Sequence, residues 1–478
     1  GCPVTGVSRD RGVPGPGCPN KRERGAGAGV FMEPIQAGPD VLESIEPKES
    51  AYYNCIRCGL CLAVCPTYRE HLTETASPRG RVALTRKSME GSLDLSPNLL
   101  GQMYSCFDCM ACDEVCPVGI RPADLALAMR QVGEWRRPKR WKRLLFEGLI
   151  GKACRLEAAT LPLRLYERSG LRRLVYRLGL DRILPARIRD LEAMLPRLPQ
   201  RPLRRVLPEI IPADGESRRR VGFFLGCAQS LLFAGGSRAA LRVMARNGST
   251  VLAPKEIECC GMPALGYGRR DLALDQARRN IEVFERLGVD VVVTDCATCG
   301  SMLKDYASLL GEDPAWARRA AAFSRKVRDI SEFLSEIPLE KPGGRVEQRV
   351  TYHDPCHLRR GQKVWREPRR LLSLIDGLEF VELPEADWCC GSAGSQLITH
   401  YDTSRKVLDR KLDNIASTGA GIVASGCPAC RMQLLAGLRG RADSVRVVHP
   451  VELLDEAYGL RGQDPGPGGG RGGACKEE

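Results

Sequence analysis

The chain has 478 residues, 22 of them cysteine, and a formal net charge of +14 at pH 7. This length favours several domains and excludes the small secreted domains in which disulfides replace a core. Residues 1–30 lack the apolar core of a signal peptide, and no apolar run approaches the ~18 residues of a membrane span. We therefore expect a cytoplasmic protein whose cysteines bind metal.

The composition divides the chain into six parts. The two ends, residues 1–39 and 462–478, are rich in glycine and are predicted to be disordered. Between them we predict a cysteine-dense helical domain over 40–132, a basic helical connector over 133–217, and two α/β domains over 218–342 and 343–461. The expected fold class is therefore α/β with an additional α-helical domain.

The helical domain carries the same cysteine motif twice. Residues 55–66 and 106–117 both read C-x₂-C-x₂-C-x₃-C-P, the pattern of ferredoxins with two 4Fe–4S clusters, in which the fourth cysteine binds the other cluster. Zinc is disfavoured because it takes two separated pairs of ligands. We therefore predict two cubane 4Fe–4S clusters. The ligands of one are Cys55, Cys58, Cys61 and Cys116, and those of the other are Cys65, Cys106, Cys109 and Cys112.

The positive charge lies in the connector. Residues 135–205 contain 20 Lys and Arg against 6 Asp and Glu, and the remaining residues are balanced at 52 of each sign (72 − 20 and 58 − 6). Leucines such as Leu161, Leu165, Leu171 and Leu174 recur at helical spacing, so we predict several short amphipathic helices. Packing within the protein or against a partner is one interpretation, and peripheral binding to an anionic membrane at the inner face of the cell membrane is another. Nucleic acid is disfavoured, because no recognition motif accompanies the charge.

The α/β region repeats itself. Cys227 matches Cys356, and the later cysteines match at offsets of 129 to 131 residues, which indicates an internal duplication. We predict strands over 221–225, 250–253 and 289–293 in the first copy and over 350–352, 379–381 and 421–424 in the second. Helices are predicted over 239–246 and 271–287. The alternation predicts parallel sheets with the cysteines at the carboxyl ends of strands, where such sheets bind ligands.

Each copy contains five cysteines. The first group is Cys227, Cys259, Cys260, Cys296 and Cys299, and the second is Cys356, Cys389, Cys390, Cys427 and Cys430. An odd number argues against disulfides and against tetrahedral zinc, whereas an adjacent pair of cysteines can reach two irons of a cluster. Gly261 and Gly391 follow the pairs and permit close backbone approach. Buried thiols that merely pack as small apolar groups are the alternative.

These cysteine groups resemble the cysteine-rich CCG domains of heterodisulfide reductase catalytic subunits. The resemblance implies that five cysteines hold a non-cubane 4Fe–4S cluster. The order of the whole chain resembles the iron–sulfur subunit of glycolate oxidase and related D-lactate, glycerol-3-phosphate and heterodisulfide reductase subunits, and residues 65–68, 77–81 and 388–394 add to it. Glycolate oxidase relatives often lack some of these cysteines, whereas both groups are complete here. One or two non-cubane clusters are therefore expected in addition to the cubanes.

Sequence motifs for other cofactors are missing. The chain shows neither a dinucleotide-binding glycine motif after a strand nor a P-loop, and no catalytic residue can be assigned. His353 and His357 flank Cys356, and we expect satisfied structural histidines there more readily than residues that tune a cluster. Cys2, Cys18, Cys154 and Cys475 receive no role.

The resemblance implies an iron–sulfur electron-transfer subunit of a flavin-dependent 2-hydroxyacid dehydrogenase complex acting on glycolate or D-lactate. An FAD-linked oxidase subunit would be its partner, and a quinone or a membrane cytochrome its acceptor. The alternative is a heterodisulfide reductase-like catalytic subunit that reduces a disulfide at a non-cubane cluster. A thiol redox sensor is disfavoured, because the two-cluster relay would then be superfluous.

Overall fold

The computed structural model describes residues 45–462, except 152, 180–182, 184–197, 200, 395, 440 and 442–443. The segment 1–39 and nearly all of 462–478, which were predicted to be disordered, lie outside the described residues, as do Cys2, Cys18 and Cys475. The side chain of Cys154 lies outside them as well.

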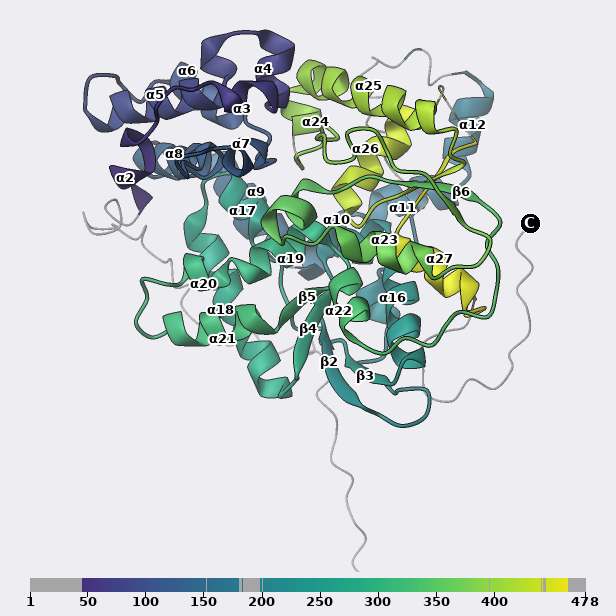
Figure 1. Cartoon of the computed structure of the whole chain (residues 1–478). Helices are drawn as coiled ribbons and strands as arrows, with labels where there is room; N and C mark the ends of the chain where they lie inside the picture. Colours follow the sequence, from purple (N-terminus) through teal and green to yellow (C-terminus); the bar gives the residue numbers. More distant parts are fainter. Residues whose placement is uncertain are drawn as a thin grey trace, which may run out of the picture. The chain divides into compact units, whose positions relative to one another are not determined.

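The N-terminal domain is helical, as predicted, and residues 45–136 contain no strand. Proline opens several of its helices, and the side chains of Ser77 and Ser96 cap two of them by accepting hydrogen bonds from Gly80 N and Leu99 N. α5 packs against α8 (Figure 1). The elements are α2 (Ser50–Tyr53), α3 (Leu60–Ala63), α4 (Pro66–His71), η1 (Glu74–Ala76), α5 (Pro78–Met89), α6 (Pro97–Tyr104), α7 (Ala111–Glu114) and α8 (Pro122–Arg136).

The connector contains the predicted short helices. They are α9 (Arg140–Leu145), the π-helix η2 (Phe146–Ile150), α10 (Ala153–Ala159), α11 (Leu161–Arg168), α12 (Leu171–Arg177) and α14 (Leu203–Val206). Its last part, however, belongs to the first sheet, because β1 (Ile210–Ile211) pairs antiparallel with β3. Among the described residues, no helix combines the length and the apolar character needed to cross a bilayer.

The two α/β copies contain equivalent sheets. The first has the order β1-β3-β2-β4-β5, and the second has the order β7-β6-β8-β9. Without β1 the two orders correspond strand for strand, so the structure confirms the duplication. The predicted parallel pairing is confirmed except at β1. The strands are β2 (Arg219–Phe223), β3 (Ser249–Leu252), β4 (Val291–Thr294), β5 (Val327–Asp329), β6 (Arg349–Tyr352), β7 (Glu379–Phe380), β8 (Ile422–Ala424) and β9 (Arg446–Val448).

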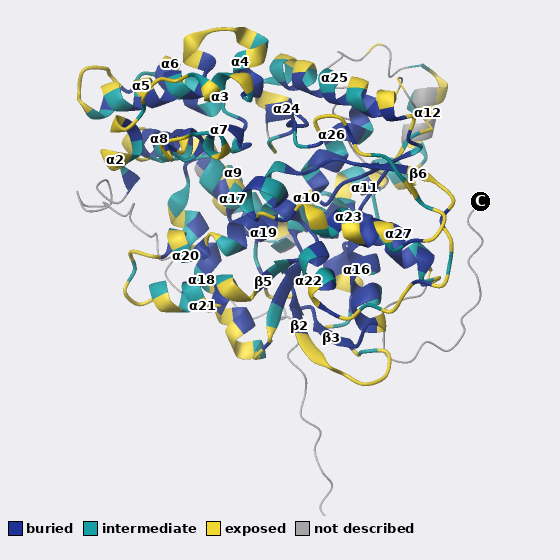
Figure 2. Cartoon of the chain, in the orientation of Figure 1, coloured by how far each residue is buried: buried dark blue, intermediate teal, exposed yellow. Residues whose placement is uncertain are grey.

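Helices cover both sheets, whose central strands are almost fully buried (Figure 2). Strands covered on both faces read as continuous apolar runs, which is why residues 221–225 and 421–424 were recognisable in the sequence. The helices of the first copy are α15 (Cys227–Leu232), α16 (Ala234–Arg246), α17 (Met262–Gly266), α18 (Arg270–Leu287), α19 (Ala297–Lys304), α20 (Tyr306–Leu309), α21 (Ala317–Lys326) and α22 (Ile330–Glu336). Those of the second are η4 (His357–Gly361), α23 (Arg366–Ser373), α24 (Gln396–Thr399), α25 (Tyr401–Thr418), α26 (Pro428–Leu438) and α27 (Pro450–Ala457).

The two copies pack against each other in a pseudo-symmetric way. α16 contacts α27, and α22 contacts α23. In the repeat, α16 is the counterpart of α23 and α22 is the counterpart of α27. The helices that begin at the cysteines pair in the same manner, since α15 contacts α26 and α19 contacts η4. The interface between the copies therefore brings together the ends of the sheets that carry the cysteines.

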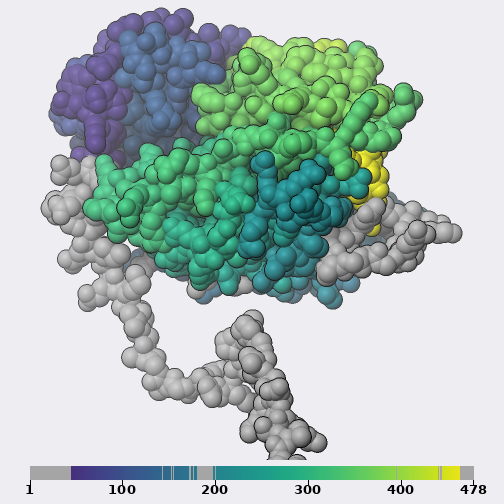
Figure 3. All heavy atoms as spheres, turned by 60° about the horizontal axis from the view of Figure 1, so that its bottom comes forward, coloured from purple at the N-terminus to yellow at the C-terminus, as the bar shows by residue number. Residues whose placement is uncertain are grey.

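The helical domain packs against the second copy. α4 contacts α25, and His71 Nε2 lies 2.9 Å from Thr403 Oγ1. In the space-filling view of Figure 3 the purple and blue helical domain borders the light-green segment around residue 400. This contact places the second cysteine motif beside the second α/β copy.

Candidate metal centres

The first cavity of the helical domain is lined by Cys55, Cys58, Cys61 and Cys116, the four cysteines predicted to bind one cluster. Three of them come from the first motif and the fourth from the end of the second. Cys58 is exposed, and Ile56 and Leu60, which also line the cavity, are 63% and 55% exposed. This cavity therefore opens directly to the protein surface.

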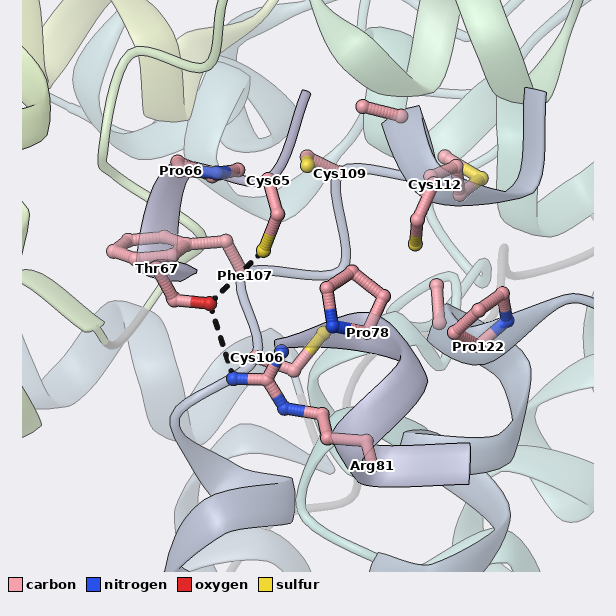
Figure 4. A pocket seen from close by; sticks show the side chains of 13 residues that line it. Cys65, Pro66, Thr67, Pro78, Arg81, Cys106, Phe107, Cys109, Cys112 and Pro122 are labelled. Carbon is pink, nitrogen blue, oxygen red and sulfur yellow. Dashed lines mark hydrogen bonds between the residues drawn. The ribbon is translucent and has the colours of Figure 1, made fainter. Parts of the chain in front are cut away.

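The second cavity is lined by Cys65, Cys106, Cys109 and Cys112, the other predicted set (Figure 4). Cys65 Sγ lies 3.1 Å from Thr67 Oγ1, which accepts a hydrogen bond from Arg81 at 3.1 Å. Arg81 is 2% exposed and also donates to Gln102 O and Ser105 Oγ. A buried positive charge below four thiols favours an anionic occupant.

The two motifs share an unusual backbone. Arg57 and Asp108, the residues before the second cysteine of each motif, both have positive φ, at 57° and 51°. Gly59 and Met110, the residues after it, have φ of 85° and 57°. Such conformations cost non-glycine residues about 1 kcal/mol each and are retained where function requires them. The repeated strain shows that both loops are shaped to hold their thiols around a common centre.

The protonation of these thiols fits a metal-binding role. Burial raises the pKa of Cys61 and Cys106 to about 11 and that of Cys112 well above its ordinary value. Without a cation the thiolates would be costly to bury, and bound iron would supply the compensating charge. The donors, the cavities and the buried arginine therefore fit 4Fe–4S clusters.

The first cysteine group of the α/β region gathers where strands give way to helices. Cys227 follows β2 and opens α15, and Cys296 caps α19 with its sulfur 3.4 Å from Cys299 N. The Cys259-Cys260 loop is held by Tyr306 Oη and Asn280 Nδ2, which donate to the carbonyls of Cys260 and Cys259. Within the group, Cys227 lies beside Cys259, and Cys260 and Cys296 lie beside Cys299. The structure thus brings all five predicted cysteines together.

The second group repeats this arrangement. Cys356 precedes η4, Cys427 directly precedes α26, and Cys390 lies beside both Cys389 and Cys430. Gly391 after the pair has φ of 84°, and a Cβ there would lie 2.5 Å from Ser404 O, so only glycine fits. Cys356 is half-buried beside the group and packs with Cys389.

The donor sets adjoin one another. Cys112 lines both cavities of the helical domain. Cys109 of the second cavity packs with Cys389, and this contact lowers the pKa of the Cys109 thiol and raises that of Cys389. Between the two α/β copies, Thr298 Oγ1 lies 3.5 Å from Cys427 Sγ. The four cysteine sets therefore form a series. It begins at the exposed first cavity of the helical domain, continues through the second cavity to the cysteine group of the second α/β copy, and ends at the cysteine group of the first copy.

The two histidines beside Cys356 behave differently. His357 Nδ1 lies 3.3 Å from Cys356 Sγ, and its Nε2 lies 3.7 Å from Asp108 Oδ2, so it joins the second group to the second motif. His353 is buried, and neither of its ring nitrogens has a hydrogen-bond partner among the described residues. One of its ring nitrogens lies within 4.8 Å of Cys390 Sγ and Cys430 Sγ, so its polar edge is near the cysteines.

Sequence reasoning missed the charged residues around these centres. Arg130 is buried and donates to Met103 O and Cys106 O, and Arg360 pairs with Glu114 at 3.0 Å and with Asp387 at 2.7 Å. Arg81 belongs to the segment 77–81 noted for its resemblance, which was the one available signal. Arginines are frequent elsewhere in the chain, so no pattern distinguished the buried ones.

Comparisons with known families match the same segments. The profile described as cysteine-rich domain matches residues 221–304 and 350–435, and the 4Fe-4S dicluster domain matches residues 51–120. The profile described as the linker region of the glycolate oxidase iron-sulfur subunit matches residues 137–195. These matches show an iron–sulfur protein with a dicluster domain, two CCG domains and a linker.

Individual relatives agree with this assignment. A probable glycolate oxidase iron-sulfur subunit of Bacillus subtilis (strain 168) is 36% identical over 421 residues, which cover 86% of this chain and 95% of that protein. The glycolate oxidase iron-sulfur subunit of Escherichia coli (strain K12) is 29% identical, covering 84% and 93%. A fumarate reductase (CoM/CoB) subunit of Methanothermobacter marburgensis is 30% identical, covering 90% and 77%. The chain therefore belongs to the family of glycolate oxidase iron–sulfur subunits.

Proposed function

We propose that the chain is the iron–sulfur electron-transfer subunit of a flavin-dependent 2-hydroxyacid dehydrogenase complex, with glycolate or D-lactate as the substrate of its partner. The observation that carries this proposal is the continuous series of four cysteine donor sets that begins at the surface. When bound, 4Fe–4S clusters supply one-electron transfer. A chain that holds several clusters next to one another in space is suited to relay electrons between a flavoprotein and a quinone or membrane acceptor.

In this proposal the two helical-domain sets, which line separate cavities, bind cubane clusters with their fourth cysteines exchanged between the motifs. Each CCG group of five binds a non-cubane 4Fe–4S cluster. Anaerobic purification followed by iron and sulfide analysis tests these assignments. We expect ~16 Fe per chain if all four sets are filled and ~8 Fe if only the cubanes are present. Zinc in the CCG groups, or an iron content near ~4, would contradict the assignment.

The first cavity is the proposed site of contact with the FAD-linked oxidase. Its rim carries Ile56, Leu60 and Val118, three exposed apolar residues beside the exposed Cys58. Apolar groups on a surface are typical of binding sites, and a donor set at the rim shortens the distance to a partner flavin.

Replacing Ile56 by Gln tests this contact. We expect slower reduction of the chain by the partner flavoprotein, with the iron content unchanged. Ile398→Gln, which replaces an exposed apolar residue of α24, is the matched control. Equal rates in the two variants would place the contact elsewhere.

The basic connector is the proposed site of contact with the membrane. In α11 the residues Leu161 and Leu165 face solvent, at 65% and 67% exposed, whereas Arg164 is buried. Leu174 and Leu178 are exposed on the neighbouring turns, and Leu144 is 75% exposed. An apolar face turned outward within a segment of strong positive charge suits the surface of an anionic bilayer.

Binding to liposomes tests the membrane contact. We expect the protein to bind vesicles that contain anionic lipid at low salt and to dissociate at high salt, because the charges are then screened. The double variant Leu161→Gln, Leu165→Gln should lose this binding, and Ile398→Gln should keep it. Binding that is indifferent to lipid charge would exclude this interpretation.

A heterodisulfide reductase-like subunit is the second candidate. Two observations favour it, namely that both CCG groups are complete and that a fumarate reductase (CoM/CoB) subunit is among the relatives. Stopped-flow oxidation of the reduced protein separates the two functions. Rapid oxidation by a quinone analogue and not by a disulfide supports the relay, and the reverse supports the reductase.

A further inference from the structure

His353 occupies a fixed position at the end of a central strand of the second CCG domain. It follows β6, and its backbone N–H donates to Ala424 O at 3.0 Å, which continues the pairing of β6 with β8. The side chain is 1% exposed. The imidazole therefore has little freedom to leave its pocket.

The polar edge of this imidazole lies close to two cysteine sulfurs. A ring nitrogen of His353, Cys390 Sγ and Cys430 Sγ all lie within 4.8 Å of one another, and all three residues are buried. Neither ring nitrogen finds a hydrogen-bond partner among the described residues. A buried polar group without a partner is unfavourable, so its position is explained by something that binds between the three side chains.

The first CCG domain shows that the fold does not require a histidine here. His353 lies three residues before Cys356, and the residue three before Cys227 in the first copy is Phe224. Phe224 is fully buried and packs against the ring of Phe284 at a centroid distance of 6.3 Å. An apolar ring fills the equivalent position, so at this position the second copy alone carries an imidazole.

We propose that His353 donates a ring nitrogen as a ligand to the metal centre of the second CCG domain, which then has a mixed nitrogen and sulfur donor set. The first centre has thiolates alone. Imidazole is a common ligand of iron, and substitution of histidine for cysteine changes the potential of an iron–sulfur centre. The two centres, although they arose by duplication, would thus differ in their chemistry. The inference rests on the proposed clusters.

Pulsed electron paramagnetic resonance on the anaerobically purified full chain tests this proposal. Histidine labelled with ¹⁵N is incorporated, and the spectrum is compared with that of the unlabelled protein. We expect a histidine-specific nitrogen coupling of the strength of a direct iron–nitrogen bond. A coupling as weak as that of a hydrogen bond to sulfur, or no coupling at all, would overturn the proposal.

Variants assign the coupled residue. His353→Phe copies the first domain and should lose the coupling, whereas His71→Gln, at an exposed site that contacts Thr403, should keep it. If His353→Phe fails to retain iron, His357→Asn, His449→Asn and His400→Gln identify the ligand by elimination, since the chain has five histidines. Loss of the coupling in any of these three would refute the assignment to His353.

The same preparation separates this inference from the proposed function. Absence of iron from the second CCG group in the wild-type protein would remove the cluster assignment and this proposal together. Normal iron content without histidine coupling would remove only this proposal. The reciprocal variant Phe224→His is expected to leave the original coupling in place.

Discussion

The side chains of Cys109 and Cys389 pack together, although one belongs to the helical domain and the other to the second CCG domain. Phe107 and Val407 pack around them in one buried cluster. This contact joins the dicluster domain to the second CCG domain rather than to the first. The first CCG group meets the second at the interface between the copies, where Thr298 lies beside Cys427.

Replacing the fourth cysteine of each motif by serine tests whether each motif supplies one ligand to the cluster of the other motif. Cys116→Ser should perturb the cluster of Cys55, Cys58 and Cys61, and Cys65→Ser should perturb the other, because each of these positions lines the cavity of the opposite motif. Spin-resonance spectra of the reduced variants, with the iron content measured in parallel, distinguish the two clusters. If Cys116→Ser instead altered the cluster held by Cys106, Cys109 and Cys112, the ligands would not be crossed.

Gly361 allows α19 and η4 to approach closely. A Cβ at this position would lie 2.4 Å from Ser301 Oγ, in a buried contact between the two CCG domains. We expect Gly361→Ala to lower the free energy of unfolding by about 1–3 kcal/mol, as overpacking of a core does. Urea denaturation under anaerobic conditions measures the change. Gly343→Ala, where a Cβ meets nothing within 4 Å, is the control and should leave the midpoint unchanged.

Lys142 is one of the buried cations of the basic connector. Its Nζ donates to Glu134 Oε2 at 2.6 Å, to Tyr104 Oη at 2.7 Å and to Tyr267 O at 2.8 Å. Lys142→Met should cost about 3–5 kcal/mol of stability, because it leaves Glu134 charged and buried. Lys139→Met removes an exposed lysine and should have little effect on the denaturation midpoint. The double variant Glu134→Gln, Lys142→Met should regain part of the loss, and a loss equal to that of the single variant would contradict this explanation.

His449 is expected to make stability depend on pH. It is fully buried, and burial followed by the charge of Arg431 lowers its pKa to about 3. Nδ1 accepts a hydrogen bond from Val451 N, so the neutral ring caps α27. An unfolded histidine binds a proton near pH 6.5, so the stability contributed by His449 is complete above that pH and is lost as the pH falls toward 3.

The expected loss between pH 6.5 and 5.5 is about 1 kcal/mol for this single group. His449→Asn retains a capping acceptor but does not titrate, so its denaturation midpoint should fall less over the same interval. Parallel urea titrations at the two pH values compare the variant with the wild type. An identical pH dependence in both proteins would show that other groups are responsible.

The sequence alone determined the local elements and the composition of the donor sets. Cysteine spacing in residues 55–66 and 106–117 limits which thiols can share a cluster, and the apolar run at 221–225 is typical of a strand buried on both faces. The repeat offset was enough to predict a duplication. Strands β5 and β9 escaped prediction, because each contains an arginine and lacks the continuous apolar run of β8. The antiparallel β1 lay within a segment interpreted as connector.

Only the tertiary structure decided how these parts meet. Nothing in the spacing of Cys109, Cys389, Thr298 and Cys427 places them in adjoining pairs, because contacts between domains depend on the faces that helices such as α4, α19 and α25 present to one another. The same holds for His353, whose sequence neighbours suggested an ordinary core histidine. Its nitrogen meets Cys390 and Cys430 because the carboxyl ends of parallel strands β6 and β8 lie side by side at one edge of the sheet.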